Sequence, residues 1–187
     1  MADRAVSPAV GQSKFLQKLR ERKIDVHACY QCGRCSAGCP VGDFFDLPVM
    51  AVVRLAAYGE EDRLLRSRTI WLCAACETCA TRCPNGIEIA GLMDVLRELA
   101  LRKGVPAAEP RVPIFHQAFL DSVKRWGRTY EIGMIGAYKM KSGDLLGDVG
   151  LGLRMFAKGK LSLLPHAIDG RSEVAEILSG KGKEYER

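Results

Sequence analysis

The sequence predicts a mainly α-helical protein, and two observations favour this class. Apolar residues recur at helical spacing along most of the 187-residue chain, whereas the alternation of apolar and polar residues that indicates strands is scarce. With 48% hydrophobic residues, the composition is that of a globular protein and not of a disordered chain or a fibre.

Three helices are predicted in the first part of the chain, over residues 13–24, 46–59 and 60–67. The first has Ser13 as its N-cap and an apolar side made of Phe15, Leu16 and Leu19. In the second, Asp46 is the expected cap, Pro48 lies in the first turn, and Gly59 ends the helix.

The clearest predicted helix covers residues 88–104, where apolar residues form one stripe and basic residues followed by glycine mark the end. The stripe consists of Ile89, Leu92, Met93, Leu96, Leu99 and Ala100.

Three prolines between residues 105 and 113 predict a linker or crossing loop after this helix. Beyond it, further helical segments are expected over residues 113–126, 130–143, 144–160 and 172–180. We therefore expect two domains, residues 1–104 and a helical C-terminal extension over residues 105–187.

All eight cysteines lie in two short runs that share one spacing. Residues 29–40 are CYQCGRCSAGCP and residues 73–84 are CAACETCATRCP, so each cysteine recurs 44 residues later. Four thiols in so short a segment, without an apolar leader at the N-terminus, fit metal ligation in a reducing compartment better than disulfide bonding. We expect a cytoplasmic protein in which a metal-binding half has been duplicated.

Both runs follow the pattern C-x2-C-x2-C-x3-C-P, the bacterial ferredoxin spacing for [4Fe-4S] clusters. In this pattern three closely spaced thiolates hold one cluster and the fourth thiolate holds the other. The predicted ligands of cluster 1 are Cys29, Cys32, Cys35 and Cys83, and those of cluster 2 are Cys73, Cys76, Cys79 and Cys39. Because 33 residues with a helical pattern separate Cys39 from Cys73, we expect the helical form of a two-cluster ferredoxin-like domain.

Two alternative interpretations of the metal site are weaker. A pair of tetrahedral zinc sites needs only two C-x2-C pairs and leaves the third cysteine and the terminal Cys-Pro of each run unexplained. His27, two residues before Cys29, could replace a ligand, but four cysteines are already present, so a surface or packing role is favoured.

The chain offers no evident substrate chemistry of its own. The glycines of residues 147–152, GDVGLG, lack the order of a dinucleotide-binding loop, and there is no P-loop or nucleophile–base pair. The net charge of +6 is spread over 28 basic and 22 acidic residues, which argues against a nucleic-acid partner. The best apolar run, residues 47–59, is interrupted by Arg54 and is too short to span a membrane. We expect an electron carrier without catalytic residues.

Residues 29–41, CYQCGRCSAGCPV, together with residues 71–89, WLCAACETCATRCPNGIEI, resemble the electron-transferring iron–sulfur subunit of heterodisulfide reductase. The resemblance covers the segment between Cys29 and Ile89. It implies a helical protein with two [4Fe-4S] clusters that passes electrons from a flavin-containing subunit to a catalytic subunit, where a disulfide is reduced. In methanogens that disulfide joins coenzyme M and coenzyme B, while bacterial relatives occur in complexes with other substrates.

Two other functions stay open. Similar helical cluster domains occur in the iron–sulfur subunits of fumarate reductase and of glycolate and glycerol-phosphate dehydrogenases, although those chains usually carry a further [2Fe-2S] domain or a long cysteine-rich region. A non-redox metal-binding scaffold is the remaining alternative.

The C-terminal extension contains a candidate docking face between residues 144 and 160. Five apolar residues fall on one side of that predicted helix: Leu145, Leu146, Val149, Leu153 and Phe156. This face either docks a partner subunit or packs on the protein's own core.

Overall fold

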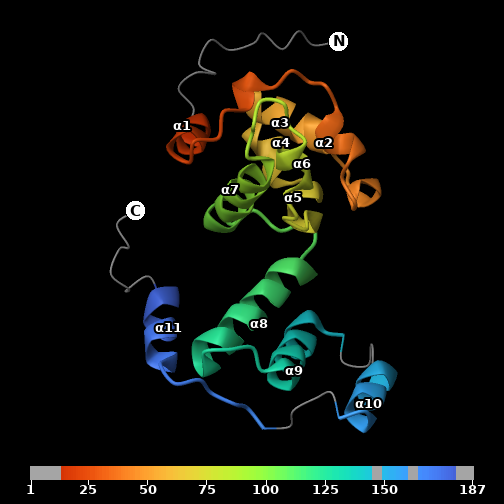
Figure 1. The fold of residues 1–187 in the computed structure, drawn as a ribbon, viewed down its shortest axis with the longest axis vertical. Coiled ribbons are helices and arrows are strands. Elements are labelled where there is room, and N and C mark those ends of the chain that lie inside the picture. Colours follow the sequence, from red (N-terminus) through yellow and green to blue (C-terminus); the bar gives the residue numbers. More distant parts are fainter. Residues whose placement is uncertain (1–13, 145–148, 160–163, 180–187) are drawn as a thin grey trace. The chain divides into compact units, whose positions relative to one another are not determined.

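The computed structural model describes residues 14–144, 149–159 and 164–179, and all regular elements within these residues are helices (Figure 1). The prediction of a mainly helical protein is therefore confirmed. The chain forms two compact units, Met1–Pro110 and Arg111–Arg187, which we call unit 1 and unit 2. Their boundary lies inside the proline-rich segment 105–113, six residues after the predicted domain boundary.

Unit 1 contains seven α-helices and two short 3-10 helices among its described residues. In chain order they are α1 (Lys14–Glu21), η2 (Val26–Ala28), α2 (Arg34–Ala37), η3 (Gly42–Phe44), α3 (Val49–Ala57), α4 (Glu61–Leu65), α5 (Thr69–Leu72), α6 (Thr78–Thr81) and α7 (Ile89–Arg102). The long helices have apolar faces, whereas α2 and α6 are single turns within the cysteine runs.

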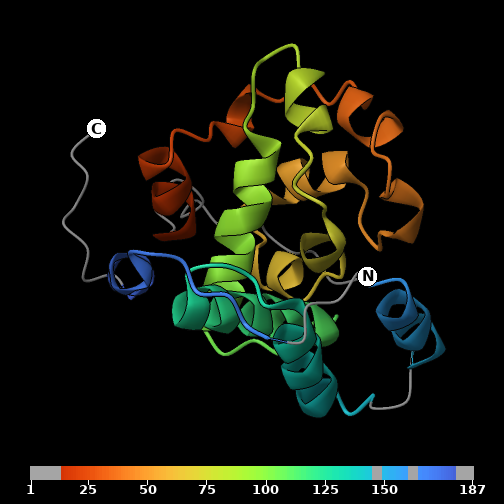
Figure 2. The same ribbon diagram turned by 60° about the horizontal axis from the view of Figure 1, so that its bottom comes forward.

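The core of unit 1 is built around α7. Every residue of the predicted stripe is buried except Leu99, and Ala90 and Val95 join it. Helix α1 lies beside α7 in Figures 1 and 2 and buries its predicted apolar residues there. Lys18 and Arg22 of α1 form ion pairs of 3.2 and 3.3 Å with Glu98 of α7, which fixes the first helix against the last helix of the unit.

Asp46 does not cap the helix that follows it, as the sequence predicts. Helix α3 begins after Pro48 without a side-chain cap. The Asp46 carboxylate instead accepts hydrogen bonds at the start of α5, from Ser67 Oγ (2.8 Å), Arg68 N (2.9 Å), Thr69 N (2.9 Å) and Thr69 Oγ1 (2.8 Å). The free N–H groups there are the orphan donors of a helix N-terminus, and a carboxylate satisfies them wherever it comes from in the sequence.

The pKa of Asp46 reflects these bonds. Burial raises the pKa of the carboxyl, but the hydrogen bonds from Ser67, Arg68 and Thr69 outweigh burial and lower it to about 2. Since Thr69 O in turn accepts the N–H of Cys73 (3.1 Å), Asp46 fixes the segment that enters the second cysteine run.

Unit 2 contains α8 (Arg111–Trp126), α9 (Glu131–Ser142), α10 (Val149–Ala157) and α11 (Arg171–Leu178). Helix α8 packs against α9 and α11, and Ser122 Oγ accepts the N–H of Tyr130 (2.9 Å) just before α9 begins. Among the residues described in this unit, Ala118 and Ser122 alone are buried. The helices of unit 2 thus form with almost no apolar core.

Helix α10 carries part of the candidate docking face, with Val149, Leu153 and Phe156 all exposed. The remaining two residues of the predicted face, Leu145 and Leu146, lie outside the described residues, as does Ser13. In the parts of the chain that the structure covers, no helix has the length and apolar character needed to cross a membrane.

Replacing Asp46 with asparagine tests its role in anchoring α5. We expect Asp46→Asn to lower the free energy of unfolding at pH 7 by about 1 kcal/mol, a discounted value because the residue is largely exposed and water screens its charge. Because the folded pKa lies below the unfolded value of about 3.9, the contribution is complete well above pH 4 and is lost as the pH falls toward 2. Urea denaturation under anaerobic conditions measures the difference.

Asp43→Asn is the matched control, because Asp43 is exposed and makes none of these bonds. It should change the free energy of unfolding by less than about 0.5 kcal/mol. Equal losses in the two variants would contradict the proposed anchor.

Candidate metal centre

The two cysteine runs share one backbone conformation as well as one spacing. Helix α2 follows Gly33 and α6 follows Glu77, and the two turns are offset by the same 44 residues as the cysteines. Left-handed backbone recurs with that offset: φ is 56° at Gln31 and 51° at Ala75, and 76° at Gly33 and 57° at Glu77. The duplication inferred from the sequence therefore extends to the fold of each run.

The structure gathers the eight cysteines into two groups of four, each lining one cavity. Cavity 1 is lined by Cys29, Cys32, Cys35 and Cys83, and cavity 2 by Cys73, Cys76, Cys79 and Cys39. Each cavity thus takes three sulfurs from one run and one from the other. This is the grouping that the ferredoxin spacing predicts.

Helices α3 and α7 supply apolar walls to both cavities. Met50 and Val53 of α3 line cavity 1, together with Ile89 of α7. On the other side, Val49 of α3 and Met93 of α7 line cavity 2. The N-terminal turns of these two helices thus contribute apolar side chains to each cavity and limit the access of solvent to whatever is bound there.

The cysteines are reduced, and their environments differ. Cys35 is buried and Cys32 and Cys76 are exposed, while the other five are intermediate. Burial raises the pKa of the Cys35 thiol, and it raises the pKa of Cys79 to about 11. At the surface, a hydrogen bond with Thr78 (Sγ–Oγ1 3.4 Å) lowers the pKa of Cys76.

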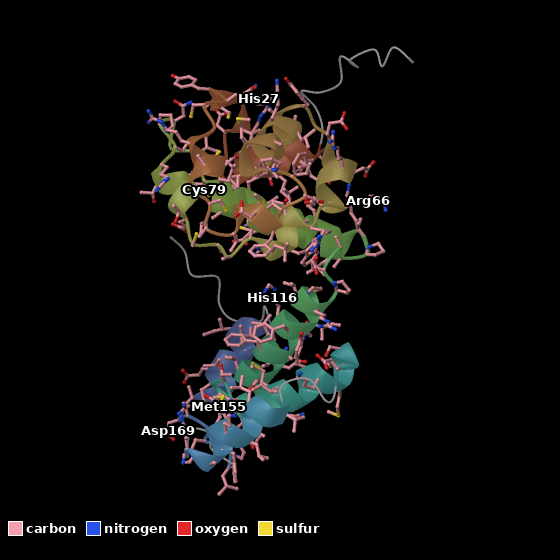
Figure 3. The ribbon with its side chains drawn as sticks, turned by 90° about the vertical axis from the view of Figure 1, so that its right-hand side faces the viewer. His27, Arg66, Cys79, His116, Met155 and Asp169 are labelled. Atoms are coloured by element: carbon pink, nitrogen blue, oxygen red, sulfur yellow. The ribbon has the colours of Figure 1, made fainter. Side chains whose placement is uncertain are left out.

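The two groups of sulfurs lie within electrostatic range of each other. After burial, the charges of Cys73 and of Cys35 are among the causes that raise the pKa of Cys79, although Cys35 lines the other cavity. The cavities are therefore neighbours in unit 1, and Figure 3 shows Cys79 on the side of the unit opposite Arg66.

Three polar side chains outside the cysteine set hold the runs in place. Asn85, two residues after Cys83, donates a hydrogen bond to the carbonyl of Ala28, which precedes Cys29. From α7, Arg97 donates to the carbonyls of Ile70 and Cys73. The third, Ser36 Oγ, accepts the first free N–H of α3, from Met50 (2.9 Å). The sequence does not predict these roles, because an isolated polar residue gives no indication of a distant backbone partner.

Backbone N–H groups reach the cysteine sulfurs, as small residues within the runs allow. The N–H of Gln31 donates to Cys29 Sγ over 3.4 Å. Gly38, in the first run, lies so close to Arg82 of the second run that an added Cβ would come within 2.2 Å of Arg82 Nη1. The two runs are therefore in direct contact where α2 meets α6.

The remaining candidate residues lie away from the sulfurs. His27 is exposed and lines neither cavity. Of the apolar residues around the second run, Ile87 and Ile89 line cavity 1, whereas Ile70 and Trp71 are buried without lining either cavity.

The chemistry of the donor set fits two cubane clusters. Four thiols surround each cavity, and a [4Fe-4S] cluster takes four cysteine thiolates. Within the described ranges, no three His, Cys, Asp or Glu side chains converge as they do around a single metal ion. Cluster binding requires the thiols to lose their protons, including the two whose pKa is raised by burial.

Comparison with known proteins gives the same cofactor. Residues 20–87 match the family model of the 4Fe-4S dicluster domain. With such a domain and eight cysteines, the chain holds two [4Fe-4S] clusters.

Curated relatives carry a consistent description, since each is the iron–sulfur "C" component of a CoB–CoM heterodisulfide reductase. Over 92 residues the chain is 36% identical to this component from Methanopyrus kandleri, and the match covers 49% of this chain and 48% of the relative. It is 37% identical over 98 residues to the corresponding component of the ferredoxin:CoB-CoM heterodisulfide reductase of Methanosarcina mazei, covering 52% of this chain and 60% of the relative. For the second such component of Methanocaldococcus jannaschii, identity is 39% over 102 residues, covering 54% and 51%. The chain thus spans about half the length of these relatives.

The left-handed backbone at Gly33 predicts a cost for any side chain there. An added Cβ would meet no atom within 4 Å, so the cost comes from the backbone, whose φ is +76°. We expect Gly33→Ala to lower the free energy of unfolding by about 1 kcal/mol. Gly33→Asn should lower it by less, because asparagine tolerates this conformation. Anaerobic urea denaturation of the cluster-loaded protein measures both losses, and an alanine variant as stable as wild type would contradict the strained position.

Proposed function

Since residues 20–87 form a 4Fe-4S dicluster domain, we propose that this chain is the electron-transfer subunit of a heterodisulfide reductase-like complex. It relays electrons in the cytoplasm between a flavin-containing subunit, similar to HdrA, and a catalytic subunit, similar to HdrB. The observation that carries the proposal is the pair of neighbouring cavities, each lined by four cysteines. Two adjoining clusters make a short path for electrons, and the names of the relatives indicate the kind of complex.

The chain's own residues have supporting roles in this relay. We propose that Cys29, Cys32, Cys35 and Cys83 bind cluster 1 and that Cys73, Cys76, Cys79 and Cys39 bind cluster 2, in a helical ferredoxin-like domain. When bound, the clusters supply reversible one-electron chemistry. The N–H of Gln31 and the hydroxyl of Thr78 stabilise negative charge on the sulfurs they contact.

Unit 2 is the proposed docking extension, within the predicted segment 105–187. Its helices expose large apolar side chains and bury almost none, so a partner subunit is needed to cover them. Helix α10 offers Val149, Leu153 and Phe156 at positions i, i+4 and i+7, a spacing that fits an apolar groove.

The iron–sulfur subunit of another oxidoreductase, of the fumarate reductase, glycolate dehydrogenase or glycerol-phosphate dehydrogenase type, is the second candidate. All eight cysteines already line the two cavities, so no cysteine is left for a [2Fe-2S] centre in this chain. A non-redox metal scaffold is disfavoured by the same four-and-four arrangement.

The metal content tests the relay directly. Protein purified without oxygen should contain about eight iron atoms and eight inorganic sulfides per chain, and reduction with dithionite should give EPR signals of reduced [4Fe-4S] clusters. Bound zinc, or clusters that stay silent after reduction, would rule out the relay.

The ligand sets make a separate prediction about pairs of cysteines. Serine in place of one ligand changes the electronic environment of its own cluster most strongly. We therefore expect Cys39→Ser to alter the same EPR component as Cys73→Ser, and Cys83→Ser to alter the same component as Cys29→Ser. Uncrossed ligation predicts the opposite pairing of spectra.

Docking through α10 is tested by placing a charge on its exposed face. Leu153 is 71% exposed, and Leu153→Asp or Phe156→Asp should reduce partner subunits recovered with the tagged chain about tenfold, since one lost anchor costs more than about 1.4 kcal/mol. Leu101→Asp in unit 1 is the control, with a leucine 61% exposed. Undiminished recovery of the partners with both α10 variants would count against docking.

A further inference from the structure

Each cavity has one exposed cysteine, and each lies on a loop of the duplicated backbone. We call residues 30–34 loop 1 and residues 74–78 loop 2. Loop 1 contains Cys32 and loop 2 contains Cys76, the exposed members of the two groups. An electron partner must approach close to a cluster because electron tunnelling weakens steeply with distance, so these two loops are the natural approaches.

The loops share a backbone but differ in side chains at equivalent positions. The pairs, with loop 1 first, are Tyr30 and Ala74, Gly33 and Glu77, and Arg34 and Thr78. Loop 1 therefore presents an aromatic ring and a cation, while loop 2 presents small residues and an anion. Tyr30 is 76% exposed, although tyrosine side chains are usually at least partly buried in a monomer.

The charges on the loops are unpaired. Arg34 is the one charged residue that lines cavity 1, and Glu77 is the one that lines cavity 2, among the residues the structure describes. Neither side chain forms an ion pair within those same residues. Unpaired charges next to an exposed edge steer an oncoming partner and fix its orientation.

We propose that the two loops dock two partners of opposite charge. Loop 1 receives an electron-transfer protein with an acidic docking surface and a pocket for Tyr30, a residue type enriched in binding hot spots. Loop 2 receives a second protein with a basic surface that fits closely over the small residues around Glu77. One partner loses one electron, the other gains one, and the chain returns to its starting state. The inference rests on the proposed relay and adds which edge each partner uses.

Binding of redox proteins of known charge tests this assignment. The probes are a strongly acidic flavodoxin and a strongly basic cytochrome c, both oxidised, titrated into the cluster-loaded full chain at low salt in a calorimeter. We expect Arg34→Glu to weaken flavodoxin binding about tenfold and Glu77→Lys to weaken cytochrome c binding about tenfold. Each variant should leave the affinity for the other probe unchanged or higher.

Controls with the same charge change separate the loops from the net charge of the chain. Arg66→Glu and Asp62→Lys alter exposed residues of unit 1 that line neither cavity, and Figure 3 shows Arg66 opposite Cys79. These controls should change each affinity by less than about twofold. Arg34→Gln, Glu77→Gln and Tyr30→Ala, checked for iron content, keep the test valid if a charge reversal disturbs the fold.

The outcomes separate the inference from the proposed function. Equal effects of Arg34→Glu and Arg66→Glu, or no binding of either probe to the wild-type chain, overturn the assignment of the loops. A wild-type chain that binds the probes but, once reduced, passes electrons to neither of them leaves the charge assignment standing and overturns the relay.

Discussion

Each cavity takes three sulfurs from one cysteine run and the fourth from the other, and the architecture of unit 1 depends on this exchange. A cavity of this kind forms only when both halves are folded against each other. The core therefore has to bring together segments 44 residues apart, and α3 and α7 meet this need by lining both cavities with apolar residues. A cluster bound in either cavity would cross-link the two halves, so that binding energy becomes folding energy.

A set of polar contacts positions the sulfurs before any cluster is considered. Asp46 holds the start of α5, Arg97 holds its end through Ile70 and Cys73, and Asn85 links the second run to Ala28 ahead of the first. All of these contacts act on backbone groups. The cysteine runs contain little regular structure of their own, so side chains from elsewhere replace the missing helix and sheet partners.

Local patterns in the sequence predict the helical class, the apolar faces of α1 and α7, and the backbone repeat behind the cysteine spacing. They do not predict partners that arise only from the tertiary fold. Asp46 has the residue type and position of a cap for the next helix, yet the free N–H groups of α5 take it because the fold brings them within 3 Å. Arg97 looks like any basic residue on an exposed helix face. The helical pattern of unit 2 is equally visible, but periodicity marks an apolar face without indicating what covers it.

Gly38 and Arg82 occupy the same position in the two cysteine runs and face each other where α2 meets α6. The arginine fills the space that the glycine leaves. Two identical halves could not pack in this way, because two glycines would leave a gap and two arginines would bring like charges together. A single chain that contains both halves is free to place one residue of each kind at the contact. Fusion of the halves therefore allowed them to become complementary, and a symmetric pair of separate copies would have no means of reaching this packing.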